Sequence, residues 1–214
     1  MSTKGERTRA GILRKTAELM NRQGFLAAPL SAVIEATGIQ KGGLYRHFES
    51  RDALAEAALE HAVDQVRERF QQALVGRHDA RERLLAIVHA HGRDSDGIDV
   101  PLPGGCPIMN CAIESDHAHP ALRERARAAM SGWQGLLVRI VEAGLRAGEI
   151  RAGTCPQEVA STLTACMEGA VMLTQLYGDV SHWRAAQRHL EHYIEHDLAP
   201  CPAASSLKGR TTSC

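Results

Sequence analysis

The chain has 214 residues, enough for one large globular domain or two modest ones with a buried core. Hydrophobic residues make up 44% and charged residues 23%, which are ordinary values for a soluble globular protein. The formal net charge is zero, but residues 1–52 carry nine basic and five acidic side chains (+4), whereas the remainder carries sixteen and twenty (−4). A basic segment joined to an acidic remainder favours a polyanion-binding head on a body with another task.

The sequence shows no signal for export or for a membrane. The segment from Met1 to Arg9 lacks the apolar core of a signal peptide, and no run of 18 or more apolar residues occurs. We therefore expect a cytoplasmic protein without membrane contact. Six cysteines are present without a CxxC pair, and in a reducing compartment they are expected as free thiols.

The first third of the chain has the apolar periodicity of helices. Four are expected, at about residues 7–22, 30–36, 41–48 and 53–74. Gly24 follows the first as a C-terminal glycine should, and Thr37-Gly38 breaks the second. Ser50 is the expected N-cap of the long fourth helix.

The rest of the chain continues this helical pattern. Five more helices are expected, at about residues 80–91, 106–115, 120–147, 156–177 and 182–197. Residues 92–105 hold four glycines, two prolines and three aspartates and are expected as a surface loop, and the tail 200–214 is expected to be disordered. The predicted fold is all-α, with a three-helix head (1–52) and a six-helix body (53–199).

The head has the order of a helix-turn-helix. In this arrangement one helix crosses the phosphate backbone, a glycine turn follows, and the next helix enters the major groove. Gly38 supplies the turn. Beyond it, Lys41 and Arg46 can reach phosphates or base edges, and Tyr45 and His47 can donate to phosphates.

Two adjacent glycines, Gly42 and Gly43, open the expected recognition helix. Each weakens a helix by about 1 kcal/mol relative to alanine. Their small size would give clearance where the backbone approaches DNA or a neighbouring helix. A plain surface turn is the alternative for this stretch alone. A nucleotide-binding loop is disfavoured, because no strand precedes it and neither GxGxxG nor GxxxxGK[ST] is present.

The run "RTRAGILRKTAELMNRQGF…LSAVIEATGIQKGGLYRHFESRDALAEAAL", about residues 7–59, resembles the DNA-binding domain of the TetR family of bacterial one-component transcriptional repressors. A second stretch, "GGCPIMNCAIE", is similar to a segment found in part of that family. The resemblance implies a homodimer in which each subunit has a DNA-binding head and a six-helix ligand-binding and dimerisation body, with the dimer interface in residues 156–197. It implies contacts with operator DNA at Ser31, Lys41, Gly43, Tyr45, His47 and Arg51, and core positions at Leu44 and Phe48.

Two residues of the head depart from the pattern of the family. Gln40 stands where Ser or Thr is more usual at the start of the recognition helix, so that cap is expected to be weaker. Ile34 replaces a residue that is usually small where the two helices cross, which affects the expected packing angle.

Cys106 is the most informative residue of the body. It precedes Pro107, which favours the first position of a helix, so Cys106 is the expected N-cap. A thiol there would have a lowered pKa and could sense electrophiles or oxidants, with Cys111 as a resolving partner. The alternative, which we favour, is a small buried residue that fills the start of a helix.

The body also offers residues for an apolar ligand pocket, although such stripes are usually core. Asn110 and Glu114 lie one helical turn apart and could be polar anchors of a cavity, or equally a solvated or helix-pairing face. A metal site at Cys106, Cys111, His117 and His119 matches no standard zinc spacing. The candidate pocket or sensor residues are Cys106, Met109, Asn110, Cys111, Glu114, Trp133, Leu137, Met167 and Met172.

These patterns predict a homodimeric, DNA-binding transcriptional regulator, most simply a repressor that leaves its operator when a small molecule binds or a thiol is modified. We expect no catalytic residue, cofactor or metal, since no nucleophile elbow, HExxH or Walker motif is present. The alternatives are a helical small-molecule-binding protein or enzyme that does not use its helix-turn-helix for DNA, and a module whose basic head binds an acidic protein.

Overall fold

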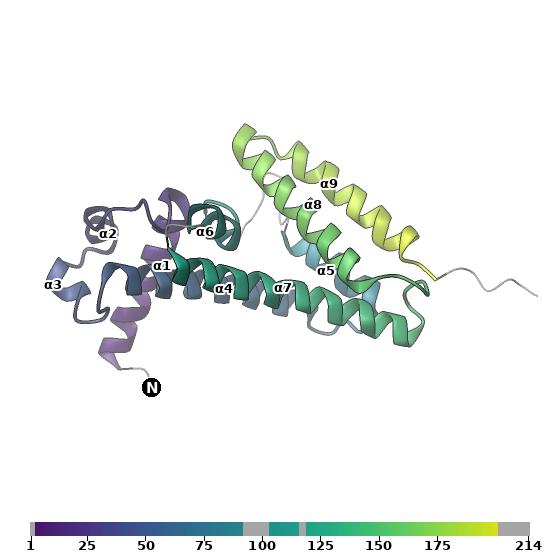
Figure 1. Ribbon diagram of the computed structural model, residues 1–214, viewed down its shortest axis with the longest axis horizontal. Helices are drawn as coiled ribbons and strands as arrows, with labels where there is room; N and C mark the ends of the chain where they lie inside the picture. The colour runs from purple at the N-terminus through teal and green to yellow at the C-terminus, as the bar shows by residue number, and fades with distance from the viewer. Residues whose placement is uncertain (1–2, 92–102, 116–118, 201–214) are drawn as a thin grey trace, which may run out of the picture.

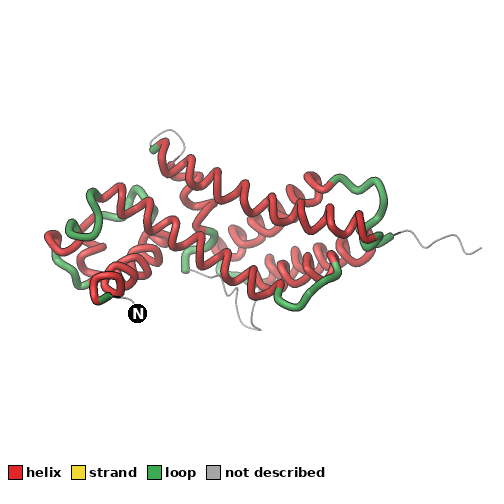
Figure 2. Tube along the Cα trace, turned by 90° about the horizontal axis from the view of Figure 1, so that it is seen from below, coloured by secondary structure: helices red, strands yellow, loops and turns green. Residues whose placement is uncertain are grey.

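The structure, a computed structural model, describes residues 3–91, 103–115 and 119–200, and in these ranges it contains helices and no strand (Figures 1 and 2). The all-α prediction is therefore confirmed. The helices are α1 (Lys4–Gln23), α2 (Leu30–Thr37), α3 (Lys41–Leu44), α4 (Arg51–Leu74), α5 (Ala80–His91), α6 (Pro107–Ser115), α7 (Pro120–Ala147), α8 (Pro156–Tyr177) and α9 (Ser181–His192), followed by a π-helical turn (Tyr193–Asp197). None of these helices combines the length and apolarity that a membrane span needs. Most of the expected 92–105 loop and nearly all of the 200–214 tail lie outside the described residues.

The helix ends differ from the prediction at three places. The first helix starts earlier, because Thr3 and Glu6 form a capping box in which each side chain accepts from the other's backbone N–H, at 3.2 and 2.7 Å. The third is α-helical only over Lys41–Leu44, and turns continue the chain to His47. It is short because Gln40 makes no side-chain cap and two glycines follow. The last expected helix is divided between α9 and the π-helical turn.

The head is formed by α1, α2 and α3, and α1 packs against both α2 and α4 (Figure 1). Val33 of α2 and Leu44 of α3 are in the same core cluster. The core of the head continues into the body without a break. Apolar side chains of α1, the α1–α2 connection and α4 are in one cluster with Ile108 and Cys111 of α6 and with Leu122 and Ala126 of α7. The head is therefore packed directly on the start of α4 and on α6.

The body has a second core on the far side of the molecule. It is built from α5, α7, α8, α9 and the end of α4, and α8 packs against both α7 and α9 (Figure 1). Trp183, Leu137 and Met167 are fully or almost fully buried there. The long helices α4 and α7 pack against each other and run from the first core to the second, so they join the two ends of the molecule.

Candidate DNA interface and ligand cavity

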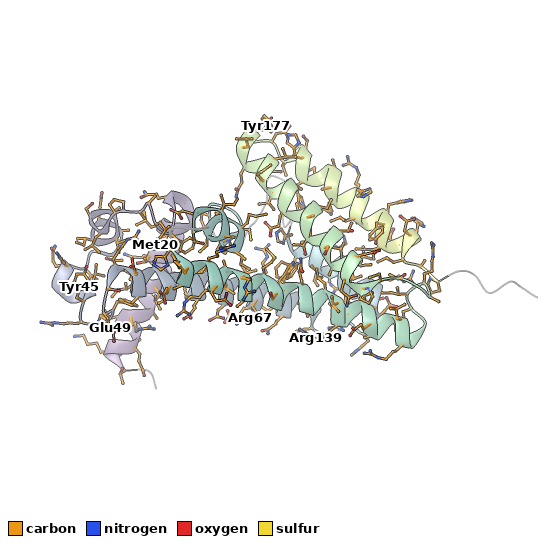
Figure 3. All side chains as sticks on the ribbon, in the orientation of Figure 1. Met20, Tyr45, Glu49, Arg67, Arg139 and Tyr177 are labelled. Atoms are coloured by element: carbon orange, nitrogen blue, oxygen red, sulfur yellow. The ribbon has the colours of Figure 1, made fainter. Side chains whose placement is uncertain are left out.

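The predicted recognition surface is exposed at the outer end of the head. Lys41, Tyr45 and Arg46 are exposed, Tyr45 to 40%, and His47 is half-buried. Figure 3 shows Tyr45 at this end, away from the body. Leu44 is buried beneath this surface, where it anchors the short helix. Two cations and a phenol are thus exposed within one short segment, which suits contacts with a phosphate backbone and with base edges.

The two adjacent glycines have different surroundings. A Cβ atom added at Gly43 would lie 2.7 Å from Cγ2 of Ile39, so this glycine allows the close approach of the turn. A Cβ atom at Gly42 would meet nothing within 4 Å. Clearance toward a neighbouring side chain therefore explains Gly43, while clearance toward DNA stays a prediction for Gly42.

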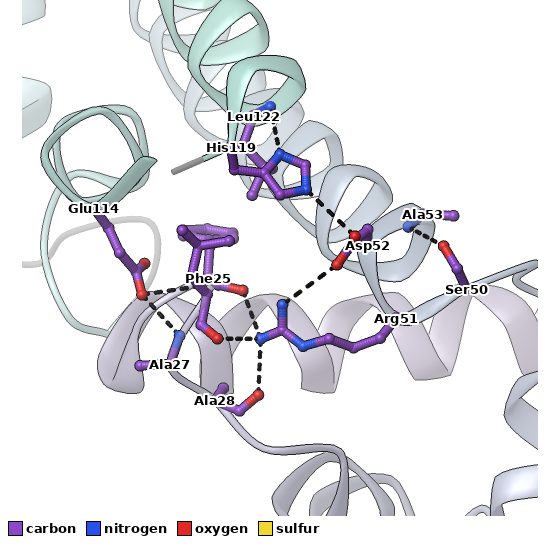
Figure 4. Close-up of polar contacts among 11 residues, drawn as sticks. Phe25, Ala27, Ala28, Ser50, Arg51, Asp52, Ala53, Glu114, His119 and Leu122 are labelled. Carbon is purple, nitrogen blue, oxygen red and sulfur yellow. Dashed lines mark hydrogen bonds and ion pairs between the residues drawn. The ribbon is translucent and has the colours of Figure 1, made fainter. Parts of the chain in front are cut away.

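Two other predicted DNA contacts, Ser31 and Arg51, lie outside the segment from Lys41 to His47. Ser31 is exposed in the first turn of α2. Arg51 is partly buried, and its Nη2 atom donates to the carbonyl oxygens of Phe25, Leu26 and Ala28 at 2.9, 2.7 and 2.9 Å (Figure 4). This side chain holds the α1–α2 connection against α4, a structural role that the sequence did not reveal.

Helix α6 is bonded to the same connection of the head. The Oε1 atom of Glu114 accepts from the backbone N–H groups of Leu26 and Ala27 at 2.9 and 2.8 Å (Figure 4). Gly24, at a φ of 103°, leaves room for this carboxylate, because a Cβ atom there would lie 2.4 Å from Glu114 Oε1. Asn110 donates to the backbone oxygen of Asn21 at 3.2 Å, to the Asn21 side chain at 3.1 Å and to Gly104 at 2.7 Å. Asn110 and Glu114 thus form the helix-pairing contact and are not anchors of a cavity.

The start of α7 is also tied to the start of α4. The backbone N–H of Leu122 donates to Nδ1 of His119 at 3.2 Å, which leaves Nε2 facing Asp52, 3.6 Å from its Oδ2 (Figure 4). One turn further along, Arg125 pairs with Glu56 at 2.8 Å. Polar contacts therefore join α7 to the start of α4, next to the head.

A cavity of about 350 Å³ lies between the two cores. Its walls come from α4, α6, α7 and α8 together with His91 and Gly105, and the apolar lining includes Val66, Phe70 and Ile108. This volume is at the small end of the range for ligand pockets, about 300–1,000 Å³. The walls include α4 and α6, the helices that contact the head.

Three polar side chains of the cavity lining are buried or half-buried, and these define its inner part. Glu168 of α8 is 9% exposed; burial raises its pKa, and its hydrogen bond with the Cys106 thiol acts in the opposite direction. Burial, then the Glu168 carboxylate, raise the pKa of Cys106. His91 is 8% exposed, and its pKa is lowered to about 4 by burial and by the charge of Arg69, so its imidazole is neutral at pH 7.

The cavity has an aromatic wall. Phe70 lies 4.6 Å from the ring of Trp133 and 5.4 Å from that of His91, and His91 stacks in turn on Trp183 at 5.3 Å, all between ring centroids. The indole N–H of Trp133 donates to Oγ1 of Thr164 at 3.1 Å. Trp133 therefore offers the cavity an apolar ring whose polar atom is already bonded.

Cys106 is at the N-cap, as expected, but its surroundings differ from the prediction of an activated thiol. The backbone N–H of Met109 donates to its Sγ atom at 3.5 Å. Burial beside a carboxylate opposes the helix dipole, and the expected lowering of the pKa is therefore wrong. Cys111, the suggested resolving partner, is fully buried in the core of the head, where burial raises its pKa to about 11.

Of the predicted pocket residues, Cys106 and Trp133 line the cavity. The others lie elsewhere: Asn110 and Glu114 bond to the head, Cys111, Leu137 and Met167 are packed in the cores, Met109 is half-buried on α6, and Met172 is exposed on α8. Among the described residues no three His, Cys, Asp or Glu side chains are grouped as a metal site would need, and His117 lies outside them.

Sequence reasoning missed Glu168 and His91, although both break an apolar pattern. His91 follows Leu84, Ile87 and Val88 at helical spacing on the buried face of α5. Glu168 lies on α8 among the buried Leu163, Met167 and Val171. A titratable residue at an apolar position of a helix was the available signal.

Comparison with known proteins supports the reading of both parts. The family "Bacterial regulatory proteins, tetR family" matches residues 12–58, and "Tetracyclin repressor-like, C-terminal domain" matches residues 80–190. A TetR transcriptional regulator from Chloroflexus aurantiacus is 39% identical, with a TM-score of 0.86 over 92% of this chain and 98% of that one. The HTH-type transcriptional regulator UidR of Escherichia coli K12 is 32% identical over 88 residues, 41% of this chain and 45% of the length of UidR. A transcriptional regulator from Saccharomonospora viridis, solved in complex with choline, is 23% identical, with a TM-score of 0.74 over 91% of this chain and 98% of its own.

Proposed function

The chain belongs to the TetR family of DNA-binding transcriptional regulators, and we propose that it is a homodimeric repressor that a small molecule in the cavity releases from its operator. Family membership makes it a regulator and not an enzyme. We also propose residues 1–52 as the DNA-binding domain and 53–199 as the ligand-binding and dimerisation domain. In this proposal the residues that contact the duplex are Ser31, Lys41, Gly42, Gly43, Tyr45, Arg46, His47 and Arg51.

The observation that carries the proposal is the position of the cavity. Its walls include α4 and α6, and both helices are attached to the head, α6 through Glu114 and Asn110 and α4 through Arg51. A ligand that favours one arrangement of α4 and α6 would thereby favour one position of the head. Two heads must fit major grooves about 34–36 Å apart, so a small rotation is enough to weaken binding. The Saccharomonospora viridis protein supports the idea that this fold can hold a small molecule.

The proposed dimer interface is the outer face of α8 and α9. Met172, Leu176 and Tyr177 are 56%, 70% and 66% exposed on α8, an unusual concentration of large apolar side chains on the surface. Figure 3 shows Tyr177 at the C-terminal end of α8, at the outer edge of the body. Their burial against a second copy would remove this apolar surface from water.

Release by a small molecule is favoured over release by thiol modification. A thiol reacts as its thiolate, and the raised pKa of Cys106 keeps it protonated at pH 7. Cys111 is buried in the core of the head. A ligand requires only the cavity that the structure already contains.

The proposal is tested with a duplex selected from random sequence by the full-length protein. Binding of this duplex, followed by fluorescence anisotropy, should weaken steeply as salt rises and should be lost in the Lys41→Ala, Tyr45→Ala double variant. Arg14→Ala, which removes an exposed cation from α1, is the matched control and should bind nearly as the wild type does. Failure to select any duplex, or full binding by the double variant, would contradict the proposal.

A further inference from the structure

We propose that the ligand of the cavity is a small apolar molecule carrying a protonated amine, and that Glu168 receives its ammonium group. This inference rests on the function proposed above and names the chemical class of the ligand. It is carried by the position of one carboxyl group, by the aromatic rings that line the cavity, and by the difference between the buried and the exposed charged side chains of its lining.

Among the residues that the structure describes, no cationic side chain is paired with the carboxyl group of Glu168. This residue is 9% exposed, lines the cavity, and shares a hydrogen bond with the Cys106 thiol, which is neutral. A buried carboxylate is costly unless a charge or several hydrogen bonds compensate it. A ligand with an ammonium group would supply both the missing charge and N–H donors, whereas a ligand carboxylate would add a second negative charge at the same place.

The rest of the inner lining also suits an organic cation. The rings of Phe70, Trp133 and His91 lie together on one side of the cavity, and aromatic faces attract cations. His91 is neutral at pH 7 and therefore does not repel an ammonium group. Val66 and Ile108 supply the surface against which the apolar part of such a molecule would pack.

The cations of the cavity are at its outer rim. Arg67 and Arg139 are both exposed, and Figure 3 shows them along α4 and α7. Arg67 is paired with Asp64, so part of its charge is already balanced. A shallower depression that shares Arg67 with the cavity adds Glu60 and Asp64. Among the described residues that line the cavity itself, Glu168 is therefore the acidic side chain, and it is buried, while the two arginines are exposed.

The experiment compares three probes that share one ring and differ in the polar group: cyclohexylmethylamine, cyclohexylmethanol and cyclohexanecarboxylate. Each is titrated to millimolar concentration into the full-length protein without DNA at pH 7, and binding is followed by tryptophan fluorescence and by the shift in melting temperature. The amine should bind at least tenfold more tightly than the alcohol, and the carboxylate should bind weakest. Glu168→Gln should reduce the affinity for the amine at least tenfold and leave that for the alcohol nearly unchanged.

The matched control is Glu158→Gln, which removes an exposed carboxylate from the same helix and should leave all three affinities as in the wild type. Equal binding of amine and alcohol, preference for the carboxylate, no binding of the amine, or an unchanged amine affinity in Glu168→Gln would each overturn the inference. Release of the selected duplex is measured separately. If the amine binds as expected but does not weaken DNA binding, the ligand class stands and the proposed release mechanism fails.

Discussion

The junction between head and body and the cavity of the body treat buried polar groups in opposite ways. At the junction, Arg51 and Glu114 each bond to two or more backbone groups of the α1–α2 connection. In the cavity, Glu168 and His91 are buried among apolar and aromatic side chains, and the pKa of each is shifted toward its neutral form. A side chain bonded to several backbone groups holds two segments together, even though Oε2 of Glu114 is buried without a hydrogen-bond partner among the described residues. A buried titratable group without such backbone bonds leaves interaction energy for a ligand. The difference teaches where this molecule is built to be rigid and where it is built to bind.

The prediction with the largest expected effect concerns the junction, where the side chain of Arg51 is removed. Its Nη2 atom donates to three carbonyl oxygens, so Arg51→Ala leaves these groups without their donor in a partly buried place. We expect the free energy of unfolding to fall by about 3 kcal/mol, measured by urea denaturation of the full-length protein. Arg14→Ala, at an exposed site on α1, is the control and should change it by less than about 0.5 kcal/mol. If Arg51→Ala also lowered the free energy of unfolding by less than about 0.5 kcal/mol, the proposed contrast between the junction and the cavity would be contradicted.

The next prediction concerns the cavity and the contribution of His91 to the pH dependence of the free energy of unfolding. The pKa of its imidazole is lowered from 6.5 to about 4 in the folded protein. Between these values the unfolded chain binds a proton that the folded one does not, so stability is lost as the pH falls from about 6.5 to 4. The loss attributable to this residue should reach about 3 kcal/mol.

The matching variant is His91→Phe, which keeps a ring between Phe70 and Trp183 and has nothing to titrate. The difference in unfolding free energy between wild type and variant should grow as the pH falls through this window. Parallel curves for the two proteins from pH 7 to pH 4 would show that His91 is not buried in its neutral form.

The Glu168 carboxyl group is expected to have a smaller effect on the free energy of unfolding than His91, and its effect changes with pH in the opposite direction. Burial raises the pKa of this carboxyl group, so the folded protein holds its proton at a pH where the unfolded chain has lost it. Stability therefore falls as the pH rises through the unfolded-state pKa and up to the raised value. Glu168→Gln should raise the unfolding free energy at pH 7 by about 1 kcal/mol, and the gain should vanish below the unfolded-state pKa. A loss of stability at pH 7 would mean that Glu168 is compensated in the empty cavity.

The sequence was most informative where structure is local. Glycine favours the C-terminal end of a helix and serine the N-cap. The structure has Gly24 and Gly38 at C-caps and Ser50 at an N-cap, as the sequence predicts. The cavity was harder to predict from the sequence. It is formed by segments from Val63 to Glu168, and no local pattern shows that these segments meet. Asn110 and Glu114 illustrate the limit. Their spacing put them correctly on one face of α6, but only the fold shows that this face meets the head.

The prediction with the smallest expected effect compares the two glycines that open the recognition helix of the head. Gly42→Ala adds a methyl group where nothing lies within 4 Å, so the gain in helix propensity, up to about 1 kcal/mol, should appear as increased stability. At Gly43 the same change brings a Cβ atom to 2.7 Å from Cγ2 of Ile39, which should cancel or reverse that gain.

DNA binding by these two variants then separates packing from clearance. If Gly42 is small because the duplex comes close, Gly42→Ala will be the more stable protein and the weaker DNA binder, as seen by denaturation and by anisotropy with the selected duplex. If it binds DNA as the wild type does, the backbone at this position stays away from the duplex. The functional requirement for small residues would then be confined to Gly43, where it is a matter of packing on Ile39.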